Sequence, residues 1–256
     1  MDFFNNKKRV VQRAIVSAVA SSLIAFNSFA STSEDYEKAL TAFNQNEYDE
    51  AYIHLKNSLQ KDPENLAAKI LMGEILLING YLTAAEMEFV EALEMGADIN
   101  LLAEPLGNTW LFLNRYQEIV DFSDLNKLSG DAEREWLMIR ATACIRLQDE
   151  SCALRDYNTI VSRTPNFVPA INGLASIALQ NEDLSKATSL INKAMSLEPK
   201  NAITWRLKGQ LAYRQGDTDA ATAHLQKALT FNRDDPIALR NLVDLYLEAK
   251  ELLKIL

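Results

Sequence analysis

The chain has 256 residues, of which 48% are hydrophobic and 24% are charged, and its formal net charge is −9. With only 8 Gly and 6 Pro, this composition excludes a disordered tail, a collagen-like fibre and a small disulfide-stapled scaffold. The acidic balance argues against nucleic-acid binding, because a phosphate backbone needs a dense field of Lys and Arg.

Residues 1–30 have the pattern of a secretory signal peptide. A basic N-terminal stretch precedes an apolar run over 14–26, and Ser28 and Ala30 occupy the small-residue positions before a cut at Ser31. The run is shorter than the about 20 apolar residues that a membrane span needs. We therefore expect cleavage, a periplasmic mature chain and no transmembrane segment after cleavage.

A period of 34 residues organises the rest of the chain, 31–256. The windows lie near 32–65, 66–99, 100–133, 134–167, 168–201, 202–235 and 236–256. Position 8 of the first six windows holds only small residues: Ala39, Gly73, Gly107, Ala141, Ala175 and Gly209. Position 20 holds Ala51, Ala85, Ile119, Ala153, Ala187 and Ala221.

Each window predicts two amphipathic helices, because apolar residues recur at steps of three and four. Small residues at positions 8 and 20 let the two backbones approach closely, and Asn46, Gly80, Asn114 and Gly216 at position 15 suit a left-handed turn between the helices. A single hairpin cannot cover its apolar face, but stacked neighbours can. We therefore predict an all-α, right-handed α-solenoid of about six and a half repeats.

The sixth window resembles the tetratricopeptide repeat family through Trp205, Gly209, Gly216, Ala221 and Leu225. The third window is the weakest match. Its Ile119, Ser123 and Asn126 replace small or apolar residues, and Pro105 inside its first helix indicates a late start or a kink.

A closer resemblance is to the large periplasmic tetratricopeptide proteins of bacterial exosortase (PEP-CTERM) systems, through the segments 91–98 and 114–118. That resemblance implies a role in exopolysaccharide export or surface-protein sorting.

The family resemblance implies that partners bind on the concave wall formed by the first helices. The candidate partner-binding residues are Leu77, Leu111, Phe112, Arg146, Arg206, Tyr213, Arg214 and Arg240. Such a wall suits a protein or peptide partner, although several apolar members could instead cover the neighbouring helix. Arg206 and Arg240 share position 5 and form a possible site for an acidic peptide or anionic glycan. In the alternative interpretation each arginine pairs with a local acid, such as Asp244 one turn from Arg240.

Cys144 and Cys152 lie on either side of a predicted turn, where they either form a disulfide or stay as two buried thiols. No phosphate-binding loop, catalytic triad order or metal-spaced Cys/His cluster occurs in the sequence. We therefore expect a non-enzymatic protein without a cofactor.

The C-terminal helix carries an apolar stripe formed by Leu242, Leu245, Tyr246, Ala249, Leu252, Leu253 and Leu256. A terminal solenoid helix normally needs a polar outer face, so the stripe predicts self-association or further repeats downstream. Taken together, the sequence favours an exported interaction scaffold of the bacterial envelope. The alternatives are an assembly factor of an outer-membrane secretion or pilus machine and a glycan-binding accessory protein.

Overall fold

The computed structural model describes the backbone of residues 34–255 and the side chains up to residue 248. Within that range the chain forms thirteen α-helices and one short 3-10 helix, with no strand. The predicted signal peptide lies outside the described residues. The chain divides into two compact units, the first ending at Leu147 and the second beginning at Gln148.

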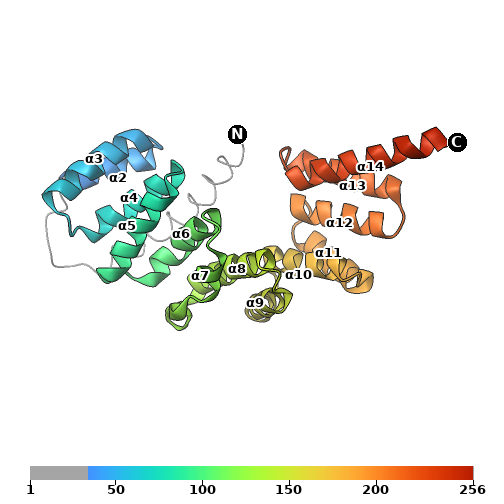
Figure 1. Ribbon diagram of the computed structural model, residues 1–256, viewed down its shortest axis with the longest axis horizontal. Coiled ribbons are helices and arrows are strands. Elements are labelled where there is room, and N and C mark those ends of the chain that lie inside the picture. Colours follow the sequence, from blue (N-terminus) through green and yellow to red (C-terminus); the bar gives the residue numbers. More distant parts are fainter. Residues whose placement is uncertain (1–33, 256) are drawn as a thin grey trace. The chain divides into compact units, whose positions relative to one another are not determined.

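The first unit contains the first three helical hairpins and the first helix of the fourth (Figure 1). Its elements are α2 (Glu34–Asn44), α3 (Tyr48–Lys61), α4 (Leu66–Ile78), α5 (Leu82–Glu94), α6 (Ile99–Phe112), α7 (Tyr116–Val120), η1 (Ser123–Lys127) and α8 (Gly130–Arg146).

The second unit continues the same alternation. Its elements are α9 (Glu150–Arg163), α10 (Val168–Gln180), α11 (Leu184–Leu197), α12 (Ala202–Arg214), α13 (Thr218–Phe231) and α14 (Pro236–Ile255). Within this unit α10 contacts α11 and α12 contacts α13, so the fifth and sixth windows of the sequence each fold as one hairpin. The predicted all-α architecture of paired helices is confirmed within each unit.

The residues at positions 8 and 20 lie at contacts between helices: Gly73 and Gly209 face the second helix of their own hairpins, and Gly107 faces α8 of the next repeat. All of them are buried, and Ile119 at position 20 of the third repeat is also fully buried. A Cβ atom added to Gly73 would lie 2.5 Å from Cε1 of Phe89. Larger residues at this position would therefore force the helices apart.

The turn between paired helices has the predicted left-handed backbone. Asn46, Gly80, Asn114 and Gly216 have φ values of 63°, 82°, 59° and 82°. The same position of the other two complete repeats holds Gln148 and Glu182, whose φ values are 62° and 59°. The fold therefore imposes this conformation even on residues with long side chains, at a small local cost.

The third repeat departs most from the pattern. Its second helix shortens to the five residues of α7 and is followed by the 3-10 helix η1. The expected late start of the first helix is wrong, because α6 begins at Ile99 and includes Pro105 in its interior. The indole rings of Trp110 and Trp136 and the ring of Phe122 pack against one another beside these short elements.

The C-terminal helix α14 exposes an apolar face that only partly overlaps the predicted stripe. Leu242 and Leu245 are buried in a core cluster with residues of α13, whereas Leu239 and Val243 are exposed together with Tyr246. The remaining members of the predicted stripe, from Ala249 onward, lie outside the residues whose side chains are described. None of the described helices is long and apolar enough to cross a membrane.

Candidate functional site

The second unit contains a hollow of about 740 Å³ on the side formed by its first helices. We call it the C-terminal hollow. Residues of α10, α12 and α14 supply most of its wall. Its lining includes Ser176, Leu179, Gln180, Arg206, Gln210, Tyr213, Arg214, Ile237, Asn241, Asp244, Leu247 and Glu248. Three of the sequence-predicted binding residues, Arg206, Tyr213 and Arg214, therefore lie in one concave site.

Arg206 is held by a carboxylate at the base of the final helix. Its Nε donates to Oδ2 of Asp235 at 3.0 Å, and the two side chains are only 14% and 7% exposed. The other oxygen of Asp235 accepts the backbone N–H groups of Ile237 and Ala238 at 2.9 and 3.0 Å. Asp235 thus caps α14 and neutralises Arg206 at once.

The other two arginines predicted in this half also have acidic partners. Nη1 of Arg214 lies 3.4 Å from Oε1 of Glu182, and Nε of Arg240 lies 3.9 Å from Oδ2 of Asp244. The Arg240 side chain is 82% exposed and does not line the hollow. Each of these arginines thus has the local acidic partner of the alternative interpretation, and Arg240 does not line the hollow with Arg206.

Tyr213 stands at the rim, near the end of α12. Its hydroxyl donates to Oε1 of Glu248 on α14 at 2.9 Å, and this hydrogen bond raises the pKa of the phenol. Tyr213 is 43% exposed, and Ile237 and Leu247 of the lining are also exposed. Exposed apolar groups beside satisfied charges favour an amphipathic segment over a strongly charged ligand.

Amide side chains supply the uncharged polar part of the hollow. Gln180, Gln210 and Asn241 line it, and each carries both a donor and an acceptor. Such groups can hydrogen-bond the backbone of an extended peptide whatever its sequence. The arrangement can therefore hydrogen-bond a peptide backbone.

The candidate residues of the first unit are placed differently. Leu77 is only 2% exposed and belongs to the core, so it offers almost no surface to a partner. Leu111 and Phe112 are partly buried and pack against core clusters. Arg146 is exposed in the last turn of α8. Here the alternative interpretation, in which apolar residues cover neighbouring helices, describes Leu77 best.

The first unit also carries a row of acids that the sequence analysis missed. Glu74 on α4, Glu104 on α6 and Glu135 on α8 come from three successive first helices, and we call them the acidic wall. Glu74 lies in electrostatic range of Glu104, and Glu104 in range of Glu135. Burial, reinforced by the neighbouring carboxylate, raises the pKa of Glu74 to about 8 and that of Glu104 to about 7.

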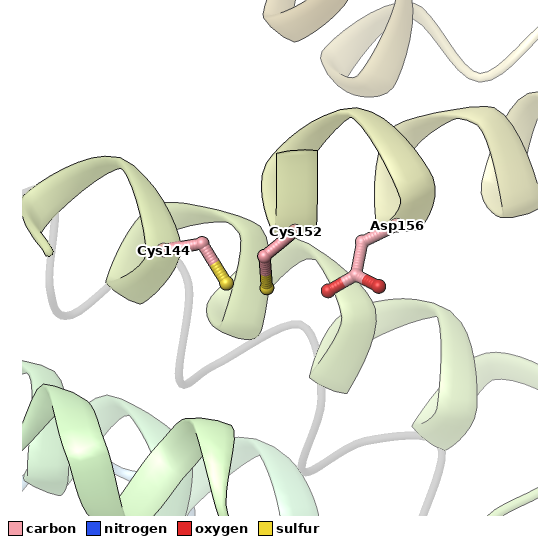
Figure 2. A group of neighbouring side chains, drawn as sticks. All are labelled: Cys144, Cys152 and Asp156. Carbon is pink, nitrogen blue, oxygen red and sulfur yellow. The ribbon is translucent and has the colours of Figure 1, made fainter. Parts of the chain in front are cut away.

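The two cysteines and Asp156 converge between α8 and α9 (Figure 2). Their ligand atoms lie within 4.8 Å of one another, and all three residues are buried. Both cysteines are disulfide-bonded, and the chain has only these two. Their sulfur atoms are therefore not thiolates, which are the form that binds metal ions.

A family model described as tetratricopeptide repeat matches residues 36–99, 172–236 and 206–253, which is more than half of the chain. The chain therefore belongs to the tetratricopeptide repeat family. A curated relative is the TPR repeat-containing protein MJ1428 of Methanocaldococcus jannaschii, with 26% identity over 81% of this chain. The chain spans about a third of that relative's length, since the match covers 34% of it.

Solved structures show the same fold. PilW, a type IV pilus biogenesis factor, matches with a TM-score of 0.65 and 18% identity over 81% of this chain and 96% of its own. PilF of Pseudomonas aeruginosa matches with a TM-score of 0.64 and 14% identity over 82% and 96%. The Cut9–Hcn1 complex matches with a TM-score of 0.66 and 15% identity over 83% and 42%. At these identities the similarity concerns the fold alone.

Proposed function

We propose that the chain is a non-enzymatic interaction scaffold that holds an extended, amphipathic segment of a partner protein in the C-terminal hollow. The observation that carries this proposal is a concave site whose arginines already have acidic partners and whose wall also carries exposed apolar side chains and amide groups. Apolar side chains of the segment would contact Tyr213, Ile237 and Leu247, while its backbone would bond to the amides. A repeat scaffold of this family supplies such concave surfaces by stacking its hairpins.

The test compares a variant that fills the hollow with one that carries the same bulk elsewhere. Peptides of about twelve residues, which span about 40 Å when extended, are selected from a random library for binding to the full chain. We expect them to bind Asn241→Trp at least about tenfold more weakly, a loss of about 1.4 kcal/mol. Lys193→Trp places the same indole on an exposed position of α11 and should leave binding unchanged.

The salt dependence gives a second readout of the same binding. Because acids balance Arg206 and Arg214, raising the salt concentration should change the affinity of the selected peptides little. Selected peptides that bind Asn241→Trp as tightly as the unchanged chain would place binding elsewhere and overturn the proposal.

We further propose that this scaffold works in the bacterial envelope. The basic and apolar pattern of residues 1–30 supports export, and an envelope scaffold suits either exopolysaccharide export or the assembly of a secretion or pilus machine. N-terminal sequencing of the chain recovered from the periplasm should give Ser31 as the first residue. Recovery of the uncut chain from the membrane fraction would contradict cleavage and release into the periplasm.

A further inference from the structure

Two pairs of exposed apolar side chains mark the two ends of the helices that form the C-terminal hollow. Ile203 on α12 and Ile237 on α14 share position 2 of consecutive repeats, and Tyr213 and Leu247 share position 12. All four are exposed, and all except Ile203 line the hollow. We call Ile203 and Ile237 the first patch, and Tyr213 and Leu247 the second patch.

Hydrogen bonds at both ends show that α12 and α14 run side by side in the same direction. Near the start of α12, Arg206 donates to Asp235, which caps the start of α14. Near the opposite end, the hydroxyl of Tyr213 donates to Glu248. Equal positions of the two repeats therefore lie at equal heights along the two helices. Because a helix rises about 1.5 Å per residue, the step from position 2 to position 12 separates the patches by about 15 Å.

The fold itself does not need exposed apolar residues at these positions. Position 2 holds Ala67 in the second repeat, Glu135 in the fourth and Pro169 in the fifth. Position 12 of the fifth repeat holds Leu179, which is buried. The sixth and seventh repeats, in contrast, expose a large apolar side chain at both positions. This recurrence around one hollow favours a surface that a partner covers.

Polar side chains line the hollow between the two patches. Asn241 follows Ile237 by four residues on α14, which places it about 6 Å further along the helix. Gln210 on α12 also lies between the two ends, and both amides can donate and accept hydrogen bonds. The hollow therefore presents an apolar end, a polar middle and a second apolar end.

We propose that the C-terminal hollow recognises an extended segment that carries two large apolar residues four positions apart and a polar residue midway between them. In an extended chain every second side chain points to the same side, and four residues span about 13 Å. The reach of the two apolar side chains covers the remaining distance between the patches. The polar side chain, about 7 Å from each of them, meets Asn241. This inference rests on the proposed function and adds the sequence pattern that the partner must carry.

The test uses three peptides of about twelve residues and equal composition, each with two leucines in a background of Ser, Gln and Ala. The leucines are four residues apart in the first peptide and three apart in the second, where an extended chain points them to opposite sides. They are ten apart in the third, the spacing of a helix that lies along the hollow. Fluorescence anisotropy of the labelled peptides gives their affinities for the full chain.

We expect the first peptide to bind at least about tenfold more tightly than either of the others, because only its two leucines reach both patches at once. Equal affinities of the three peptides, or tightest binding of the third, would overturn the proposal.

Variants of the chain assign each leucine to a patch. Ile203→Ser with Ile237→Ser removes the first patch, so replacing one of the two leucines by Ala should then cost less than about twofold. Replacing the other leucine should still cost at least about tenfold, because the second patch is intact. Val243→Ser removes an exposed apolar residue of α14 outside the hollow, and both leucines should still matter there. Equal sensitivity to the two leucines in the first-patch variant would overturn the proposal.

The sequence pattern and the proposed function fail in different ways. Peptides selected from the random library should themselves carry two apolar residues four positions apart. Selected peptides that lack this spacing but lose binding in Asn241→Trp would overturn the pattern and leave the hollow as the peptide site. Selected peptides that bind Asn241→Trp unchanged would overturn both.

Discussion

Replacing Arg206 by Gln is expected to destabilise the second unit by about 3 kcal/mol, because it removes the counter-charge of a carboxylate that stays buried. The Asp235 side chain is 7% exposed, and its remaining bonds are to the first backbone N–H groups of α14. The loss should therefore appear first as faster amide hydrogen exchange in α14. Urea unfolding followed by circular dichroism gives the size of the effect.

Arg240→Gln is the matched control for that substitution. Arg240 occupies the same position of the next repeat, but it is 82% exposed and lies 3.9 Å from its acid. Its loss should change the free energy of unfolding by about 0.5 kcal/mol or less. Similar destabilisation by the two variants would show that burial of the Arg206 pair is not what stabilises α14.

The stability of the first unit should fall as the pH rises, and Glu74→Gln should remove part of that fall. Below about pH 4.5 the carboxyl is protonated in both the folded and the unfolded chain. Between that value and about 8 only the folded chain keeps the proton, so each rise in pH lowers the free energy of unfolding. The loss is at most 1.36 kcal/mol per pH unit, and we expect about 2 kcal/mol between pH 6 and pH 8.

The measurement is urea unfolding at pH 6 and pH 8, followed by the fluorescence of Trp110 and Trp136 in a Trp205→Phe background. Glutamine imitates the protonated carboxyl. The free energy of unfolding of the variant should therefore rise relative to that of the unchanged chain as the pH rises. Glu47→Gln removes an exposed acid and should not alter the slope. If the free energy of unfolding of Glu74→Gln fell with pH as steeply as that of the unchanged chain, the role given to the Glu74 carboxyl would be contradicted.

The fold was largely predictable because the same types of residue recur at the helix contacts and at the turn of each repeat. Small residues at positions 8 and 20 and the left-handed turn at position 15 each follow from one backbone requirement, so even Gln148 and Glu182 could be placed by register. The third repeat was less predictable. Its second helix ends early, and the chain that follows places Phe122 against Trp110 and Trp136.

The site was predicted only in part, because ion pairs join residues of different repeats. Asp235 closes one repeat and caps the next, and Arg206 lies 29 residues before it. The same two positions one repeat earlier hold Asn172 and Asn201, whose amide groups contact each other at 3.4 Å. A comparison of both positions in consecutive repeats could have shown that Asp235 is the partner of Arg206. A comparison of Arg206 with Arg240 alone could not.

The acidic wall was missed for a related reason. Glu74, Glu104 and Glu135 occupy positions 9, 5 and 2 of their windows, so no single column of the repeat alignment contains them. Only the stacking of three helices brings these positions into one row. A search of all the concave positions together, for charge rather than for residue identity, would have found it.

The central claim is that the C-terminal hollow holds a peptide, and photo-crosslinking with mapping of the attachment points tests it most directly. The tightest peptide from the library, carrying a photoreactive side chain, is irradiated with the full chain, and the modified residues are found by mass spectrometry. The account predicts attachment at the hollow, on Tyr213, Asn241 or Leu247, and its loss in Asn241→Trp. Attachment mainly on the outer helices α11 and α13, undiminished in that variant, would contradict it.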